Sequence, residues 1–452
     1  MNQKLNAQFD WQCYPDAAGL VDRLMRSVVD SIPFAAQLAS RMRDETGTRL
    51  VDWIDHFCLP ASHGSVDSLA DFGYVATQSA DQQIWKHTGG MFPPIRVADF
   101  DAMRLTIQVG SVADYLFAHR IDAEIDGRPM SPLRTAQVCA GDGCELWVIE
   151  RHGAADFVVP AITAEQIALA LEHSEKFLRR QREFESDADG FDHAGELIRA
   201  ASSELGVDWA CDLFFAAERR YWQSRNRAAR VQKSRQDRLG LGWANHDHHT
   251  YRNSRENFTR LIGLLEQLGF RCRERFYGGA DAGWGAQVLE QPVAGIVIFA
   301  DVDLSPTEVT GDFAHDGLSP RAELGTVGLW CKLHGEAILQ AGMHHLECQF
   351  DFDAAREQLA VEGIKSMTPF TDFDHLKQAF TEGEIWPVAG SRIETALAEG
   401  LITEPQARRF RESGSIGSHL EILQRDDGYK GFNQTGISEI IRETDPRHVS
   451  PT

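Results

Sequence analysis

The stretch from Trp243 to Leu304 constrains the fold most, because its hydrophobic pattern predicts a strand, a helix and three further strands in that order. The helix is indicated by apolar residues that recur at helical spacing, namely Phe258, Leu261, Ile262, Leu265 and Leu268. A strand rich in histidine opens the stretch, and a strand with two aspartates closes it. Ligands on the first and last strands of such a unit can meet on one face of a sheet.

Three imidazoles, His246, His248 and His249, lie on the opening strand, and Asp301 and Asp303 lie on the closing strand. Side chains alternate between the two faces of a strand, so His246 should share a face with His248, and Asp301 with Asp303. Imidazole and carboxylate together suit Fe(II), Mn(II) or Zn(II). The cluster therefore predicts a metal site, and the alternative is a polar edge strand with aspartates that cap a loop.

An earlier stretch, residues 84–150, shows a similar order of elements. Met103–Val109 alternates as a strand, Ser111–His119 is helical with Ser111 as its cap, and three strand-like runs follow. We expect the two βαβββ modules to pair into one curved mixed sheet with helices outside, an α+β fold with several helical insertions. The expected division is an N-terminal helical segment (1–64), a first module (65–158), a helical insertion (159–240), a second module with the metal site (241–310) and an α/β extension (311–452).

The composition limits the class of partner. The net charge is −22, from 45 basic and 67 acidic side chains, which argues against nucleic acid or an anionic membrane as the main partner. The eight cysteines form no Cys-x-x-Cys pair and no apolar run approaches membrane-spanning length, so a reduced, cytoplasmic setting is expected. Nucleotide-binding glycine motifs are missing from the sequence. The N-terminal helical segment could pack within the chain or form a homodimer.

The strand from His248 to Arg252 carries a resemblance to a known family. Its His-His-Thr-Tyr-Arg sequence is similar to the His-Leu-Thr-x-Arg strand of the 2-oxoadipate dioxygenase/decarboxylase (hydroxyglutarate synthase) family, in the vicinal oxygen chelate superfamily. The resemblance implies that His248 binds the metal. The family's closing strand, Phe-Gly-Glu-x-Glu, has its nearest match in Phe299–Asp303, where Asp303 replaces the ligating Glu. The family's other histidine and its substrate-binding arginine would correspond to His87 and Arg96.

The residues leave two choices open. His246 competes with His248 as the histidine ligand, because both belong to the same predicted face. The third ligand is either Asp303, at the end of the same module, or Glu347, which shares a strand face with His345.

Two functions remain possible on these patterns. The first is a mononuclear non-haem Fe(II) dioxygenase, with Mn(II) or Zn(II) as alternative metals, that oxidises a small 2-oxo acid or similar oxygen-chelating carboxylate with O₂. Arg252 or Arg96 would hold the carboxylate in a two-point grip. The second is a degenerate member of the same fold with a binding or structural role.

Overall fold

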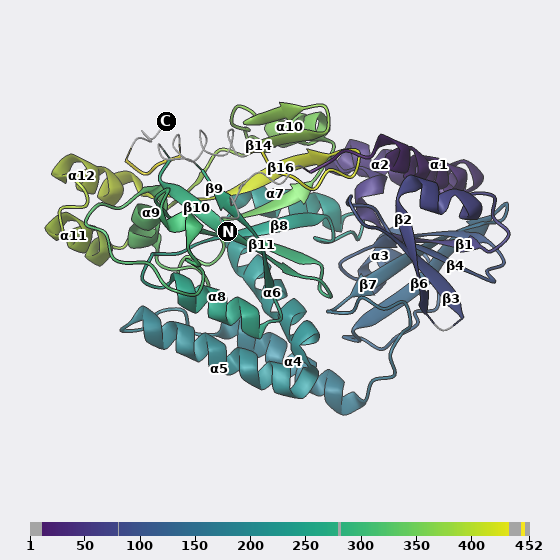
Figure 1. The fold of residues 1–452 in the computed structure, drawn as a ribbon, viewed down its shortest axis with the longest axis horizontal. Helices are drawn as coiled ribbons and strands as arrows, with labels where there is room; N and C mark the ends of the chain where they lie inside the picture. The colour runs from purple at the N-terminus through teal and green to yellow at the C-terminus, as the bar shows by residue number, and fades with distance from the viewer. Residues whose placement is uncertain (1–10, 80, 279–281, 434–443, 448–452) are drawn as a thin grey trace, which may run out of the picture.

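The computed structural model describes residues 11–79, 81–278, 282–433 and 444–447, and its long strands form two mixed sheets (Figure 1). The N-terminal sheet has the order β2 (Tyr74–Ser79), β3 (Gln82–His87), β4 (Ile95–Ala98), β1 (Ile54–Pro60), β5 (Met103–Gln108), β7 (Cys144–Arg151) and β6 (Leu133–Gly141). The C-terminal sheet has the order β13 (Thr371–Phe373), β14 (Leu376–Phe380), β16 (Ser415–Arg425), β12 (His345–Gln349), β8 (His246–Arg252), β11 (Ile296–Asp303), β10 (Trp284–Gln291) and β9 (Arg271–Tyr277), with β15 (Glu384–Trp386) paired to β16.

Helices cover both sheets. The α-helices are α1 (Pro15–Ser31), α2 (Pro33–Arg41), α3 (Val112–His119), α4 (Ala164–Arg179), α5 (Asp187–Leu205), α6 (Val207–Ser224), α7 (Arg227–Asp237), α8 (Phe258–Gln267), α9 (Thr326–His334), α10 (Phe352–Val361), α11 (Gly390–Ala398) and α12 (Glu404–Ser413). Short helical turns are η1 (Met42–Thr46), η2 (Leu50–Trp53), η3 (Val66–Phe72) and η4 (Glu308–Thr310). In Figure 1, α4, α5, α6 and α8 lie below the C-terminal sheet. No helix among the described residues is long and apolar enough to span a membrane.

Each sheet is built from two similar units that meet along antiparallel first strands. In the C-terminal sheet, β8-α8-β9-β10-β11 joins β12-α10-β13-β14-β16 through the β8–β12 pair. In the N-terminal sheet, β1-η3-β2-β3-β4 joins β5-α3-β6-β7 through the β1–β5 pair. The chain is therefore α+β with mixed sheets.

This topology corrects the expectation that residues 84–150 and 243–304 pair into one sheet, because the two stretches lie in different sheets. Residues 84–150 begin inside β3 of the first unit and contain nearly all of the second unit, β5-α3-β6-β7. β1 falls within residues 1–64, which were expected to be helical, and residues 311–452 contribute five of the nine strands of the C-terminal sheet. Alternation of side chains along a strand shows its two faces and says nothing about which strand lies beside it.

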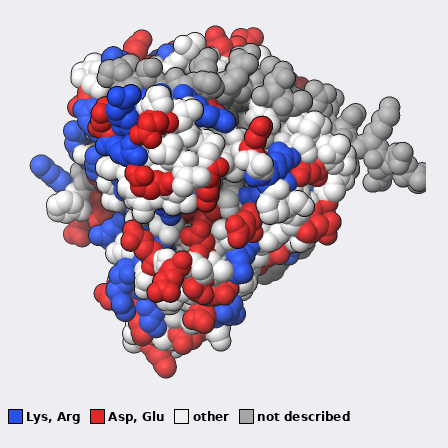
Figure 2. Space-filling model, turned by 90° about the vertical axis from the view of Figure 1, so that its left-hand side faces the viewer, with Lys and Arg blue, Asp and Glu red and all other residues white. Residues whose placement is uncertain are grey.

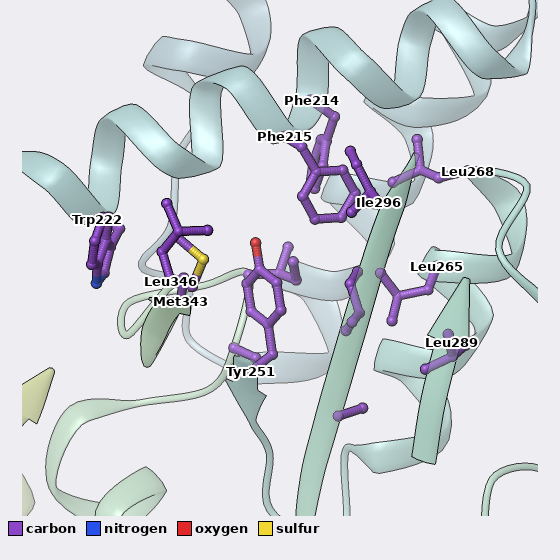
Figure 3. Packing of buried hydrophobic residues seen from close by; sticks show 14 of the residues in the cluster. Phe214, Phe215, Trp222, Tyr251, Leu265, Leu268, Leu289, Ile296, Met343 and Leu346 are labelled. Carbon is purple, nitrogen blue, oxygen red and sulfur yellow. The ribbon is translucent and has the colours of Figure 1, made fainter. Parts of the chain in front are cut away.

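The alternation along β8 separates a core face from a polar face. Tyr251 is fully buried and packs with Phe215 of α6 and with the apolar side chains of the neighbouring strands (Figure 3). The helix predicted from apolar spacing is confirmed as α8, whose buried residues include Phe258, Leu261 and Leu265. The opposite face of β8 carries the polar side chains of His248 and Arg252.

The charge on the surface is mixed. On the face drawn in Figure 2, acidic and basic side chains alternate without a continuous basic area. All eight cysteines are free thiols.

Candidate metal centre

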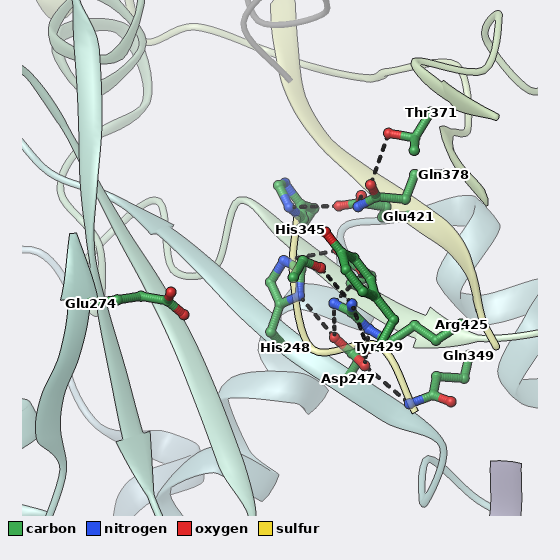
Figure 4. Close-up of polar contacts among 12 residues, drawn as sticks. Asp247, His248, Glu274, His345, Gln349, Thr371, Gln378, Glu421, Arg425 and Tyr429 are labelled. Atoms are coloured by element: carbon green, nitrogen blue, oxygen red, sulfur yellow. Dashed lines mark hydrogen bonds and ion pairs between the residues drawn. The ribbon is translucent and has the colours of Figure 1, made fainter. Parts of the chain in front are cut away.

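Three neighbouring strands of the C-terminal sheet each contribute one residue to a cluster of potential metal ligands. His248 lies on β8, His345 on β12 and Glu421 on β16. Their ligand atoms all lie within 4.8 Å of one another, and all three side chains are buried. Figure 4 shows the three side chains pointing toward one another from their strands. Two imidazoles and one carboxylate on one side of a metal form the ligand set typical of non-haem Fe(II) oxygenases.

A second group of potential ligands, Asp247, His248 and Glu347, shares His248 with the first. Its ligand atoms also lie within 4.8 Å of one another. Its Asp247 is already held by Arg425, whose Nε and Nη2 atoms donate to the two carboxylate oxygens at 3.0 and 3.1 Å. A metal ion on Asp247 would lie against this guanidinium, and like charges at such a distance repel strongly in a buried site. The group of His248, His345 and Glu421, with Glu347 beside it, is therefore the better candidate ligand set.

The first partner of His248 is Asp247, which lies 3.3 Å from its Nδ1 atom. Asp247 in turn accepts from Arg425 and, at 3.0 Å, from Gln349 (Figure 4). A carboxylate at Nδ1 favours the tautomer with its proton there, which leaves the Nε2 lone pair for a metal.

Asp247→Asn should therefore lower the affinity for Fe(II) by about 10- to 100-fold, as is typical for the loss of such an outer partner. An equilibrium titration with Fe(II) under anaerobic conditions measures this directly. The exposed Asp374 offers a matched control, and Asp374→Asn should bind metal like the wild type. Equal affinities in all three proteins would contradict the role given to Asp247.

His345 and Glu421 are also positioned by polar contacts with neighbouring side chains. His345 Nδ1 lies 2.8 Å from His344 Nδ1, so one proton shared between these atoms lets His345 offer Nε2. Gln378 donates to Glu421 at 3.2 Å and is itself fixed by Thr371. His345 Nε2 and Glu421 Oε2 are 3.0 Å apart.

The electrostatics of the cluster fit a divalent cation. Burial, reinforced by the nearby Glu421, raises the pKa of Glu347 to about 8, and burial raises the pKa of Glu421 to about 7. Neither carboxyl oxygen of Glu347 is in hydrogen-bond geometry with a described residue, although Oε2 lies 2.9 Å from His248 Nε2. Burial opposes a charge on His248, but Glu347 and Asp247 raise its pKa to about 10. A divalent cation bound between Glu347, Glu421 and His248 would offset the cost of burying these carboxylates.

The register of the sheet shows how many ligands the protein offers. Across β8 and β12, His248 lies opposite Glu347 and Thr250 lies opposite His345, so a local two-fold axis exchanges the two histidines. Phe299 lies beside Thr250, and Glu421 lies beside Glu347, so the same axis exchanges Phe299 with Glu421. The position that would complete a symmetrical set of four is thus a phenylalanine. Three protein ligands leave about three octahedral positions open.

The candidate ligands line a small cavity of about 30 Å³. Its wall combines aromatic rings with a few charged side chains, namely His248, Thr250, Arg252, Trp284, Phe299, Asp301, His345, Glu347, Phe380, Glu421 and Phe432. The ring centroid of Phe432 lies 5.5 Å from that of His248 and 4.6 Å from that of Phe299. The polar groups of the wall are therefore His248, His345, Glu347 and Glu421, the pair of Arg252 and Asp301, and the side chains of Thr250 and Trp284.

The structure separates His87 and Arg96 from this cavity, which corrects the expectation that they join His248. His87 ends β3 of the N-terminal sheet, and its Nδ1 atom accepts the backbone N–H groups of Gly89 and Gly90. Arg96 lies on β4 and donates to Gln82 at 2.8 Å. Both residues belong to the other sheet, where no group of potential metal ligands is formed by the described residues.

Asp303 has a structural role in place of the expected metal ligation. Its carboxylate accepts the backbone N–H groups of Gly325, Val327 and Gly328 at 2.7, 3.1 and 3.0 Å, at the start of α9. A Cβ atom on Gly325 or Gly328 would collide with this carboxylate, so both glycines permit its approach. The three hydrogen bonds of this carboxylate are therefore with a helix terminus.

Asp303→Ala should lower the free energy of unfolding by about 1–2 kcal/mol, because three buried N–H groups lose their acceptor. Bound Fe(II) should stay at the wild-type level. Urea denaturation and metal analysis of the same preparation measure both quantities. A loss of metal with unchanged stability would return Asp303 to the ligand set.

His246 faces the opposite side of β8 from His248, contrary to the alternation expected from sequence. A register shift lies between Glu347 and Cys348, so that Cys348 pairs with His246 while Glu347 pairs with His248. The extra residue in β8 is a bulge, which turns the strand. His246 lines a crevice with Asp212, and its ring lies 5.1 Å from that of His249.

The sequence interpretation did not identify His345 or Glu421 as ligands. Both were visible as polar residues in strongly strand-like segments. Their signal is the short pattern of His345 and Glu347 on one face, repeated by His419 and Glu421 on the neighbouring strand.

Known proteins resemble this chain weakly. No protein-family model and no curated protein matches the sequence. Among solved structures, methylmalonyl-CoA epimerase from Mycobacterium tuberculosis is 14% identical with a TM-score of 0.23, over 40% of this chain and 88% of that one. A mutant of 4-hydroxymandelate synthase from Streptomyces coelicolor is 11% identical with a TM-score of 0.28, over 87% and 97%. A xylose isomerase-like TIM barrel/4-hydroxyphenylpyruvate dioxygenase fusion protein is 12% identical with a TM-score of 0.25, over 97% and 60%. These neighbours are members of the vicinal oxygen chelate superfamily, but at such TM-scores the likeness carries no argument about this chain.

Proposed function

We propose that this chain is a mononuclear Fe(II)-dependent dioxygenase that binds a small 2-oxo acid, or a similar oxygen-chelating carboxylate, together with O₂. The observation that supports it most is the buried set of His248, His345 and Glu421 on adjacent strands. This set suits Fe(II), and Phe299 occupies the place where a fourth protein ligand would complete the symmetrical set. An Fe(II) ion held there would supply O₂ chemistry and would polarise a chelated carbonyl group.

The residues around the cavity would prepare the substrate for this chemistry. Phe299, Phe380 and Phe432 exclude water, which strengthens every electrostatic contact inside the cavity. Arg252 lines the same cavity and can donate to a substrate oxygen in a planar, two-point arrangement. Asp247 keeps the proton of His248 on Nδ1, away from the reacting positions.

Oxygen uptake tests this proposal. The protein is loaded with Fe(II) under anaerobic conditions, its metal content is measured, and O₂ consumption is followed with a panel of 2-oxo acids. We expect uptake that requires both Fe(II) and an acid from the panel, and none with the metal-free protein. Full iron loading without uptake for any acid would favour a non-catalytic binding protein of this fold.

A further inference from the structure

A further group of potential metal ligands lies on the surface at the edge of the C-terminal sheet. It consists of Glu266 in the last turn of α8, Cys272 on β9 and His315 in the loop after η4. One ligand atom from each residue lies within 4.8 Å of the other two. β9 is an edge strand, three strands away from β8, which corresponds to roughly 14 Å across the sheet. This surface group is therefore separate from the buried set that contains His248.

His315 is oriented by a carboxylate, as metal-binding histidines usually are. Its Nδ1 atom lies 2.8 Å from Asp312 Oδ2, and its Nε2 atom lies 2.9 Å from Glu266 Oε1. Arg275 of β9 donates to the other carboxylate oxygen of Asp312 at 3.3 Å. A carboxylate at Nδ1 favours the tautomer with its proton there, which leaves Nε2, on the side of Glu266, for a metal.

The same order of arginine, carboxylate and imidazole occurs behind His248. There Arg425 donates to Asp247, and Asp247 lies at Nδ1 of the imidazole. The surface group therefore repeats the outer contacts of the buried histidine and adds a thiol. The side chains of His315 and Glu266 are 45% and 43% exposed, so a metal ion can reach them from solution.

The electrostatic environment of the surface group favours a cation. Glu266 lies at the C-terminal end of α8, where the helix dipole is negative and where the last turn has no basic side chain. Desolvation, reinforced by the nearby acids Glu266 and Asp312, raises the pKa of the Cys272 thiol. The thiol keeps its proton until a metal ion displaces it, since metal ligation deprotonates a cysteine. A divalent cation would offset the charges of Glu266 and of the Cys272 thiolate.

We propose that Glu266, Cys272 and His315 bind Zn(II), with water in the fourth position and Asp312 as the outer partner of His315. Thiolate is a soft ligand, and together with imidazole and carboxylate it suits Zn(II) better than Mg(II), Ca(II) or Mn(II). The ion would connect the end of α8, the edge strand β9 and the loop after η4. This site is independent of the proposed dioxygenase function and of its Fe(II).

Co(II) is the probe that separates this site from the buried one. A thiolate ligand gives Co(II) a near-ultraviolet charge-transfer band, and the buried set of His248, His345 and Glu421 has no sulfur ligand. Anaerobic titration of the reduced protein with Co(II) should produce this band, and an excess of Zn(II) should abolish it. Cys272→Ser should lose the band. The control Cys139→Ser changes a half-buried thiol on β6 of the other sheet and should keep it.

Two further measurements test the ligands without turnover. Zn(II) should protect Cys272 from alkylation by iodoacetamide, as read by mass spectrometry of the modified peptides. Asp312→Asn should weaken Co(II) binding at the thiolate site by about 10- to 100-fold, as is typical for the loss of an outer partner. The control Asp316→Asn changes an exposed aspartate in the same loop and should bind Co(II) like the wild type.

The outcomes decide the proposal in either direction. A wild-type protein without the thiolate band, or a band that persists in Cys272→Ser, overturns the surface site and leaves the buried Fe(II) site untouched. Equal Co(II) affinities in Asp312→Asn and the wild type overturn the role of Asp312. Far-UV circular dichroism of each variant shows that the fold is retained.

Discussion

Replacement of His248 by alanine should leave the protein without bound Fe(II), whereas replacement of His246 should not. His248 belongs to the cluster with His345 and Glu421, whereas His246 lies on the other side of the β-bulge. Loss of one of three protein ligands should weaken metal binding by more than about 100-fold, since loss of an outer partner already costs 10- to 100-fold. Glu421→Ala should have the same effect as His248→Ala.

Metal analysis after anaerobic reconstitution and desalting measures this difference. His246→Ala serves as the matched control, because it removes a histidine from the same strand. Far-UV circular dichroism should be unchanged in all three variants, since the core face of β8 with Tyr251 is untouched. Stoichiometric iron in the His248→Ala protein, or its loss in the His246→Ala protein alone, would contradict the assignment.

Arg252→Lys should weaken binding of the 2-oxo acid by about tenfold or more and leave metal binding intact. The guanidinium of Arg252 lines the cavity and makes no hydrogen bond with the described residues, so its donors are available to a substrate. Lysine keeps the positive charge but lacks the planar pair of donors. The loss corresponds to about 1.4 kcal/mol of binding free energy.

Titration of the iron-loaded proteins with the best acid of the panel checks this prediction. Arg96→Lys is the matched control, because Arg96 lies in the N-terminal sheet and contacts Gln82 and His56. It should bind the acid like the wild type. If Arg96→Lys weakened binding of the acid more than Arg252→Lys, the substrate would bind at the N-terminal sheet instead.

The sequence by itself determined the local structure around the site. Apolar spacing predicted the helix α8, and the even separation of His248 and Arg252 along β8 predicted that both lie on one face. These features depend on residues close together in the chain, where hydrophobic periodicity follows directly from helix and strand geometry. His248 was chosen from this pattern together with the family resemblance.

The sequence pattern did not predict the bulge in β8. The polar sequence His246–Asp247–His248 fits an unbroken strand as well as a bulged one. The bulge is defined only by the partner strand, where one step from Glu347 to Cys348 matches two steps on β8. It turns His246 away and brings Asp247 between His248 and Arg425.

Only the tertiary structure decided the ligand set and the pairing of the units. His345 and Glu421 come from strands that are neighbours in the sheet but are separated in sequence by α10, β13, β14, β15, α11 and α12. The insertion of β15, α11 and α12 before β16 hides the second βαβββ order. Asp303 ends the same module as His248, yet it binds the N-terminus of α9. Strand order is set by packing of whole faces and by register with distant segments, and a pattern confined to one strand contains neither.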